Sequence, residues 1–173
     1  MGLQADIGME PITANVVQRF MQRVGATRLG TAVFSKVMSP LDRILHKASW
    51  GRLTAGRSFG ALSVVLLTTT GARTGLERTT PINAIPIEGD LALVATNYGS
   101  GTTPGWAHNL LGNPGALITY ENQIYDVVAR AVTDNEYEAV FSAAIRIYPG
   151  YANYRRNATN EIHVFVLGGR MKR

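Results

Sequence analysis

The stretch LLTTTGARTG at residues 66–75 changes abruptly from aliphatic side chains to hydroxyls, glycines and an arginine. The apolar run at 62–67 predicts a buried strand, and the glycines predict that the strand enters a tight loop. Glycines let backbone N–H groups approach an anion closely, while hydroxyls and a guanidinium donate hydrogen bonds to it. The stretch therefore predicts either a phosphate-binding loop or a polar hairpin turn, and both interpretations stay open on these residues alone.

The other strand signals are short and are separated by turn residues. Strands are predicted at residues 62–68, 79–87, 91–96, 116–120, 123–131 and 162–167. Pro81 and Pro86 interrupt the second of these, which makes it an edge or bulged strand because proline cannot donate to a ladder. Residues 88–90 and 121–122 predict the turns of two hairpins.

Helices are predicted between the strands, but not in regular alternation with them. One begins behind Thr103 and Pro104 and ends at Gly112, and a capping box of Thr133 and Glu136 opens a later one. No G-x-G-x-x-G sequence follows a strand, which disfavours a Rossmann fold. The pattern predicts an α+β protein built as a small, mostly antiparallel β-barrel or sheet with peripheral helices.

The N-terminal part of the chain has a different pattern. The predicted division is a helical segment with its connector over 1–60, followed by a barrel domain over 61–173. Residues 1–13 show no periodicity and predict a loose tail. Apolar residues at helical spacing predict amphipathic helices at 14–24 and 39–48. In one interpretation these helices pack onto the fold, and in the other they contact a membrane surface or cover a lipophilic pocket.

Composition narrows the function further. The chain of 173 residues is 46% hydrophobic and 17% charged, which is typical of a globular domain. No apolar run is long enough to span a bilayer and no secretory signal is recognisable, so a cytoplasmic location is expected, with the inner face of the cell membrane as an alternative. The net charge of +5 comes from scattered basic residues, without the basic stripe typical of a protein that binds nucleic acid.

The sequence offers few side chains for catalysis without a cofactor. There is no cysteine, and His46, His108 and His163 have no carboxylate at ligand spacing, so no metal site is predicted. The G-x-S-x-G elbow of serine hydrolases is also missing. An enzyme with this sequence is therefore expected to take its reactivity from a cofactor.

Three tyrosines recur at a spacing of three residues around Pro149 and Gly150. Tyr148 completes the apolar stripe of the preceding helix, which explains it as a core residue. Tyr151 and Tyr154 fall in a segment predicted to be short and irregular, at a spacing that lets them share one side. They predict either the wall of a pocket for a flat, apolar substrate or ordinary packing.

Together these motifs resemble the deazaflavin-dependent nitroreductase family, over residues 50–167. The residues that carry the resemblance are LLTTTGARTG (66–75), Arg78, Pro81, ATNYG (95–99), PGWAHNL (104–110), Asn113-Pro114 and YPGY (148–151). Their order and spacing match, and the Thr-Thr-Thr-Gly element combined with the later tryptophan and asparagine is specific. The residues before position 50 match less distinctly.

The resemblance implies a split β-barrel, of the kind shared by FMN-binding and pyridoxamine-phosphate-oxidase-like proteins. It implies coenzyme F-420, an 8-hydroxy-5-deazaflavin with a phosphodiester and polyglutamate tail, and FMN is the second candidate. The implied reaction is hydride transfer to a quinone, a nitroaromatic compound or an enone. A barrel that sequesters a lipid or cofactor without turnover and an FMN-dependent oxidoreductase stay open as alternatives. Split barrels often pair, so a homodimer is open as well.

The resemblance also implies which residues form the site. The phosphate and the acidic tail are expected to contact Thr70, Gly71, Arg73, Thr74 and Arg78. The ring and its ribityl chain are expected to lie against Pro81, Ile82, Asn83, Ala95, Thr96, Asn97, Gly105, Trp106 and Asn109. The substrate is expected to face Tyr148, Tyr151 and Tyr154. The expected catalytic donors to the acceptor oxygen are the hydroxyls of Tyr151, Tyr154 and Thr96.

Three places depart from the family pattern. Ala72 stands beside Arg73 where many members have a second basic residue. Thr96 keeps a hydroxyl where a serine is common, whereas Asn97 replaces a cation. Gly105 replaces a bulkier residue before the tryptophan. We therefore expect a weaker hold on the acidic tail and a wider pocket.

Overall fold

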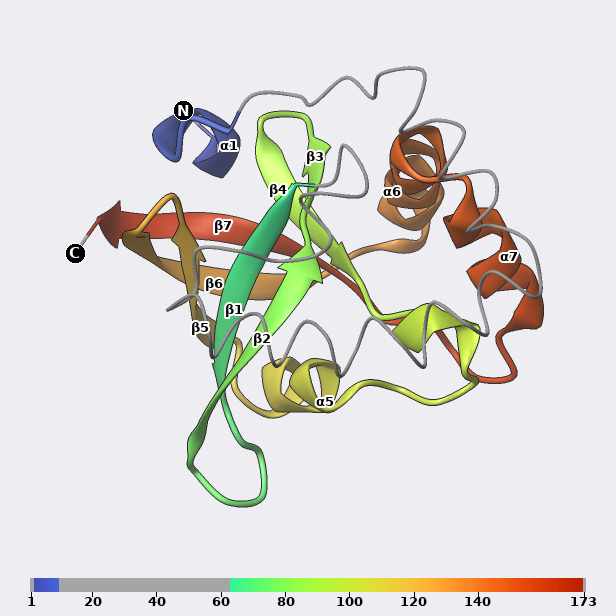
Figure 1. The fold of residues 1–173 in the computed structure, drawn as a ribbon, viewed down its shortest axis with the longest axis horizontal. Coiled ribbons are helices and arrows are strands. Elements are labelled where there is room, and N and C mark those ends of the chain that lie inside the picture. The colour runs from blue at the N-terminus through green and yellow to red at the C-terminus, as the bar shows by residue number, and fades with distance from the viewer. Residues whose placement is uncertain (1, 10–62, 173) are drawn as a thin grey trace.

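The computed structural model describes residues 2–9 and 63–172. Within these residues, seven strands form one antiparallel sheet in the order β2-β1-β5-β6-β7-β4-β3. The sheet curls into an open barrel with helices around its margin (Figure 1). The predicted fold class is confirmed, while the helices predicted at 14–24 and 39–48 and the connector at 50–60 lie outside the described residues.

Most predicted strands and helices of this part are found with shifts of a few residues at their ends, and the last strand extends to Lys172, beyond its predicted end at 167. The strands are β1 Val64–Thr70, β2 Glu77–Asn83, β3 Ile85–Ile87, β4 Asp90–Val94, β5 Gly115–Tyr120, β6 Gln123–Ala131 and β7 Val164–Lys172. The helices are α1 Leu3–Asp6, the 3-10 turn η1 Asn97–Gly99, α5 Gly105–Gly112, α6 Asp134–Ile147 and α7 Gly150–Asn157. The two predicted hairpins, β3–β4 and β5–β6, are confirmed.

The segment predicted as one interrupted strand at 79–87 forms two strands, β2 and β3, at opposite edges of the sheet. Ala84 lies between them, and its N–H donates to the Ser63 carbonyl at 2.9 Å. Pro81 and Pro86 both lie on these edge strands, where a residue without an N–H is tolerated. The two edges are therefore joined by the chain and not by a ladder of hydrogen bonds, which makes this a split barrel.

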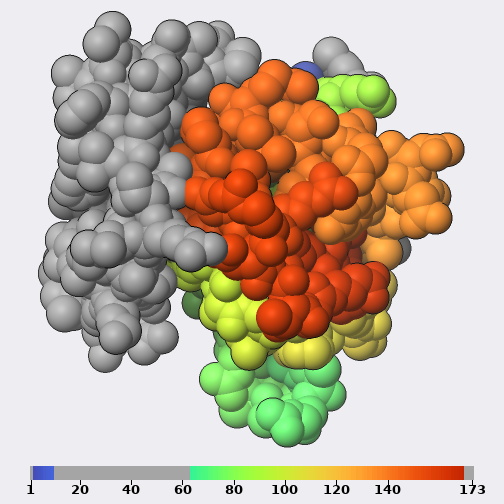
Figure 2. Space-filling view, turned by 90° about the vertical axis from the view of Figure 1, so that its right-hand side faces the viewer, coloured from blue at the N-terminus to red at the C-terminus, as the bar shows by residue number. Residues whose placement is uncertain are grey.

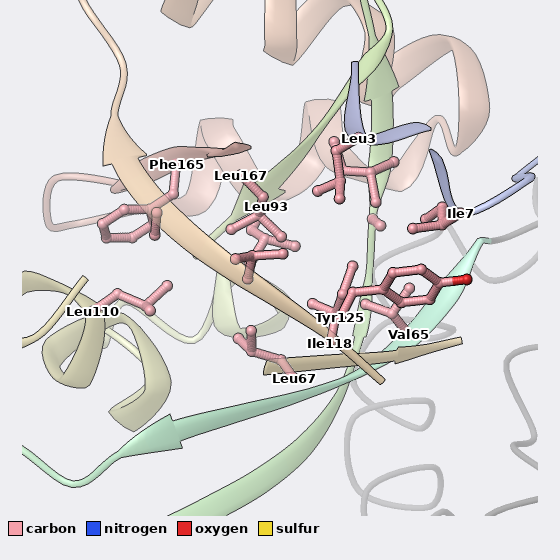
Figure 3. Packing of buried hydrophobic residues seen from close by; sticks show 14 of the residues in the cluster. Leu3, Ile7, Val65, Leu67, Leu93, Leu110, Ile118, Tyr125, Phe165 and Leu167 are labelled. Atoms are coloured by element: carbon pink, nitrogen blue, oxygen red, sulfur yellow. The ribbon is translucent and has the colours of Figure 1, made fainter. Parts of the chain in front are cut away.

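The inward-facing residues of the strands form the main core (Figure 3). Along β1, every second residue is buried, including Val65 and Leu67, as the period of a strand requires. A second core lies between α6 and the other face of β4. Leu93 belongs to the first core and Val94 to the second, so β4 is covered on both faces.

Helix α6 begins at the predicted capping box, which is confirmed. The Thr133 N–H donates to Glu136 Oε2 at 2.8 Å, and Arg130 Nη2 pairs with Glu136 Oε1 at 2.6 Å. The hydrogen bond from Arg130 is the largest cause that lowers the pKa of Glu136, to about 2. The carboxylate therefore stays ionised at neutral pH and keeps the first turn of α6 capped.

Residues 151–156 were predicted to be irregular, and this prediction is wrong because they form helix α7. The helix is short and begins at a glycine, so local propensity alone does not reveal it. Packing holds it instead: Tyr151 and Tyr154 are buried, and Arg155 Nη2 pairs with Glu138 Oε1 of α6 at 2.5 Å. Figure 2 shows α6 and α7 side by side on one face of the molecule, with the β1–β2 hairpin protruding below them.

The expectation of a loose tail over 1–13 is wrong for the described residues 2–9. The Leu3 N–H donates to Asp90 Oδ1 at 2.9 Å, and the Gln4 N–H donates to the Gly89 carbonyl at 2.7 Å. Leu3, Ile7 and Met9 are buried in the main core. A single helical turn is too short to show periodicity, which is why the sequence did not reveal α1.

Candidate functional site

The loop between β1 and β2 is a closed turn at the tip of a protruding hairpin (Figure 1). The Gly71 N–H donates to the Leu76 carbonyl at 2.9 Å, and the N–H groups of Thr74 and Gly75 both donate to the Gly71 carbonyl. Gly75 has a φ of 67°, in the left-handed region that glycine adopts without strain. The hairpin interpretation of the sequence is thus correct for the backbone, and it does not exclude anion binding.

These hydrogen bonds limit how the turn can hold an anion. Among the amides of residues 71–76, only that of Arg73 has no hydrogen bond within the described chain. The side chains must therefore supply most donors to a phosphate. Arg73 and Arg78 are exposed, and no acidic residue of the described part pairs with either guanidinium. Two cations on one hairpin that have no acidic partner among the described residues suit an anionic ligand.

Helix α5 supports this hairpin from behind. The Asn109 side chain uses both of its ends: Nδ2 donates to Thr69 Oγ1 at 2.9 Å, and Oδ1 accepts from the Ala72 N–H at 3.0 Å. Trp106 packs against the core, with its ring 6.0 Å from that of Phe165. A methyl group added at Gly105 would meet no atom of the described residues within 4 Å, so these residues leave the space before the tryptophan open.

The end of β4 leads into a strained loop. Asn97, Tyr98 and Gly99 have φ values of 43°, 58° and 74°, all in the left-handed region. Asn97 Nδ2 donates to Thr102 Oγ1 at 2.8 Å, while the Thr96 hydroxyl has no hydrogen bond to the described residues. Ala95, the residue before it, is buried in the main core. Left-handed non-glycine residues are uncommon and cluster at functional sites, and the role of Thr96 and Asn97 beside a ligand stays a prediction.

The three predicted substrate tyrosines lie together at the junction of α6 and α7. Tyr148, Tyr151 and Tyr154 have ring centroids 5.8 to 6.1 Å apart and are each 5 to 8% exposed. Tyr98 of the strained loop lies edge-on to Tyr154, at 6.4 Å. The packing interpretation therefore describes their surroundings in this structure, while a role toward substrate stays a prediction.

The hydroxyls of this tyrosine cluster (Tyr148, Tyr151 and Tyr154) remain protonated at neutral pH. Burial raises the pKa of Tyr151 to about 12, and a contact with the Asn83 amide offsets part of the increase. Burial also raises the pKa values of Tyr148 and Tyr154. Because a raised pKa keeps the O–H bond intact, these groups act as hydrogen-bond donors over the whole physiological range.

Asn83 connects the end of β2 to the tyrosine cluster. Its Oδ1 is buried and has no hydrogen-bond partner, which is costly unless a ligand supplies a donor. Pro81 lies on the same face of β2, whereas Ile82 points to the main core. The ring of a deazaflavin carries an N–H at one edge and its tail carries phosphate, so an unpaired acceptor and two unpaired arginines fit this group.

The predicted site residues thus fall into two neighbouring groups along β2. The hairpin group contains the phosphate residues together with Asn109, and the second group contains Asn83, the residues 95–97 and the tyrosine cluster. Thr69 was missed by the sequence analysis, although strand alternation already distinguishes it from Thr68 and Thr70, which point to the other face. Its buried hydroxyl is the acceptor for Asn109.

A hollow of about 730 Å³ lies elsewhere, over β1, β5 and β6. Thr68, Leu117 and Val128 line it from the face turned away from the main core, and Thr70 also reaches it. It contains neither Trp106 nor any of the three tyrosines, so we place the candidate site by its donors and acceptors and not by this hollow.

The described residues contain neither a cluster of metal ligands nor a helix that could cross a membrane. No group of three or more histidine, cysteine, aspartate or glutamate residues among them could hold a metal ion. None of their helices is both long and apolar enough to cross a bilayer.

Comparison with known proteins assigns the chain to a family. A family described as F420H(2)-dependent quinone reductase matches residues 44–168, which include both groups of the site. An F420H(2)-dependent quinone reductase of Mycobacterium tuberculosis is 31% identical over 130 residues, covering 73% of this chain and 87% of that protein.

Solved structures agree with this assignment. An F420-H2 dependent reductase is 32% identical, with a TM-score of 0.55, covering 60% of this chain and 92% of its own. A structure described as a domain-swapped dimer is 30% identical, with a TM-score of 0.57, covering 76% of this chain and 96% of its own. The curled antiparallel sheet agrees with these matches, and the chain belongs to the F420H(2)-dependent quinone reductase family.

Proposed function

We propose that this protein reduces a quinone with reduced coenzyme F-420, holding the anionic tail at the β1–β2 hairpin and the ring beside Asn83 and the tyrosine cluster. The observation that carries this proposal is that β2 bears two groups without a partner among the described residues, the exposed guanidinium of Arg78 and the buried Oδ1 of Asn83. Arg78 and Asn83 are five residues apart on this strand, about 17 Å at the usual strand rise, and the alternation of a strand turns their side chains to opposite faces. Because β2 is an edge strand, an elongated ligand with a charged tail and a flat ring can reach both residues by passing along this open edge.

When bound, the reduced coenzyme supplies the hydride, and the protein supplies binding and orientation. Arg73 and Arg78 hold the tail by charge-assisted hydrogen bonds. Asn83 Oδ1 accepts a hydrogen bond at the ring edge. The hydroxyls of Tyr151, Tyr154 and Thr96 donate to the acceptor oxygen as negative charge develops there, and burial of the two tyrosines strengthens this interaction.

Binding and turnover of two cofactors test the function. Coenzyme F-420 and FMN are titrated separately into the purified protein, and oxidation of the reduced deazaflavin is then followed with a quinone, a nitroaromatic compound and an enone. We expect tight binding of F-420 and the fastest oxidation with the quinone. Binding without turnover supports a sequestering barrel instead, and preference for FMN supports a flavin enzyme.

The Tyr154→Phe variant tests the donor role of the cluster. We expect turnover with a quinone to fall by about ten- to hundredfold, because one hydrogen bond to developing charge is worth roughly 1.5–3 kcal/mol. The affinity for coenzyme should stay the same. Tyr137→Phe is the matched control, since Tyr137 lies on α6 against Phe141 and Arg155, outside the site. Equal turnover of the Tyr154→Phe and unaltered proteins would dismiss this hydroxyl as a donor.

Location and assembly remain proposals of a different kind. We place the protein in the cytoplasm, in contact with the inner face of the membrane through residues 14–24 and 39–48. The amphipathic pattern of these residues supports this contact. Co-sedimentation with anionic lipid vesicles tests this contact, and complete recovery in the supernatant rejects it. The domain-swapped relative supports a homodimer, which a light-scattering mass decides. The domain division at residue 60 also stays a prediction.

A further inference from the structure

The first residue of the β1–β2 turn is tied to a helix that lies outside the hairpin. The Ala72 N–H donates to Asn109 Oδ1 at 3.0 Å, across 37 residues of sequence. At the other end of the Asn109 side chain, Nδ2 donates to Thr69 Oγ1 at 2.9 Å, across 40 residues. One side chain of α5 thus connects the last part of β1 with the start of the turn.

The contact is buried and closely packed. Asn109 is 9% exposed and Thr69 is 2% exposed, so neither group can exchange its partner for bulk water without a rearrangement. The last residue of α5 also adjoins the turn, since a methyl group added at Gly112 would come within 3.2 Å of Ala72 Cβ. Two positions of α5 therefore contact the same residue of the turn, Ala72.

Arg73 directly follows this fixed point. The turn is closed on its other side by the hydrogen bonds from Thr74 and Gly75 to the Gly71 carbonyl. Arg73 therefore lies between two anchored backbone segments, although its own side chain is exposed and makes no ion pair in the described part. An arginine that is held at its backbone loses less conformational freedom when it binds an anion.

We propose that Asn109 is a positioning residue, which sets the turn and with it Arg73 for the anionic tail of the coenzyme and does not itself contact the deazaflavin ring. Each polar end of its side chain already makes one hydrogen bond within the protein, and Asn109 is buried, so its remaining N–H and lone pair have little access to a ligand. This inference rests on the proposed function for the identity of the ligand. The tie between α5 and the turn can be tested without any ligand.

Four substitutions separate the hydrogen bonds from the packing. Asn109→Leu removes both bonds with little change in volume, and Thr69→Val removes only the bond between Asn109 and β1. Thr69→Ser keeps the hydroxyl and is expected to behave as the unaltered protein does. Thr68→Val is the matched control, because its hydroxyl bonds only to the Thr79 hydroxyl on the opposite face of β1.

Amide hydrogen exchange of Ala72, measured by NMR without coenzyme, tests the tie itself. We expect exchange at Ala72 to accelerate at least tenfold in Asn109→Leu, several-fold in Thr69→Val, and not at all in Thr69→Ser or Thr68→Val. Core amides such as that of Leu67 report whether each variant is folded. Unchanged exchange at Ala72 in a folded Asn109→Leu protein would overturn the proposal.

A double-mutant cycle with Arg73→Ala tests how Asn109 acts on the coenzyme. We expect Asn109→Leu and Thr69→Val to raise the dissociation constant of F-420 by about three- to tenfold, and to raise KM for the reduced coenzyme more than they lower kcat. In the Arg73→Ala background the same changes should have almost no effect, since the residue they position is gone. Additive losses would mean that Asn109 contacts the coenzyme directly, which contradicts the proposal.

The experiments distinguish a failure of the proposed function from a failure of this inference. If the unaltered protein binds no F-420, the proposed function falls, and the coenzyme part of this inference falls with it. The exchange measurement is unaffected by that outcome and still decides whether Asn109 and Thr69 fix the turn.

Discussion

Replacing Arg73 by alanine is expected to raise the dissociation constant of coenzyme F-420 by about ten- to hundredfold. A charge-assisted hydrogen bond from a guanidinium to a phosphate is worth roughly 1.5–3 kcal/mol, and each 1.4 kcal/mol corresponds to a factor of ten in affinity. The loss should be largest at low ionic strength, because salt screens an exposed charge. Fluorescence titration of the deazaflavin at two salt concentrations measures both effects.

The control for Arg73→Ala must remove the same charge from another place. Arg146→Ala does this, since Arg146 is exposed on α6, outside both groups of the site. Its affinity for F-420 should stay within about twofold of that of the unaltered protein, because distant surface charges are largely screened. Equal affinities of Arg73→Ala and Arg146→Ala would show that the phosphate lies elsewhere, and the hollow over β1, β5 and β6 would then be the next place to examine.

Among the substitutions named for this protein, Gly150→Ala is expected to lower the free energy of unfolding the most. Gly150 opens α7, and a methyl group at this position would overlap the ring of Tyr148. Neither partner can move away easily, because both are buried in the second core. Overpacking of this kind costs about 1–3 kcal/mol or more, which lowers the melting temperature of a chain of this size by about 3–10 °C.

Thermal unfolding followed by circular dichroism measures this effect. Gly168→Ala is the matched control, because its added methyl would come no closer than 3.9 Å to the Val128 carbonyl. We expect its melting temperature to stay close to that of the unaltered protein. A Gly150→Ala protein that is as stable as this control would show that the Tyr148 ring has room to turn away, and the cluster would then be looser than the structure indicates.

Local patterns predicted the strands well, but not the way in which they are joined. Pro81 and Pro86 marked an edge strand correctly, since proline is tolerated only where a ladder can spare an N–H. That the two prolines lie at opposite edges depends on the whole sheet closing around its core, which no short window of sequence contains. The capping box of Thr133 and Glu136 was predictable because all of its partners lie within three residues.

In the site, too, features that depend on neighbours in sequence could be predicted, and features that depend on distant residues could not. Tyr148 was predicted as a core residue from helical spacing, and it is buried. The hydrogen bonds of Asn109 reach residues 37 and 40 positions away, so its partners follow only from the fold. The sequence also does not reveal that Asn83 carries a buried acceptor without a partner, because that depends on its depth under α7.

The docking of α1 against the sheet has a consequence for how the chain is made. Leu3 contacts the main core beside β4 and β7, and β7 lies between β6 and β4 in the sheet. Because synthesis proceeds toward the C-terminus, residues 3–9 leave the ribosome well before β7 and wait for this strand before they are covered. At about 5–20 residues per second this delay is roughly ten to thirty seconds. Until β7 has been made, the apolar side chains of Leu3, Ile7 and Met9 are open to chaperones and to aggregation, and the barrel acquires its final stability only once this strand is in place.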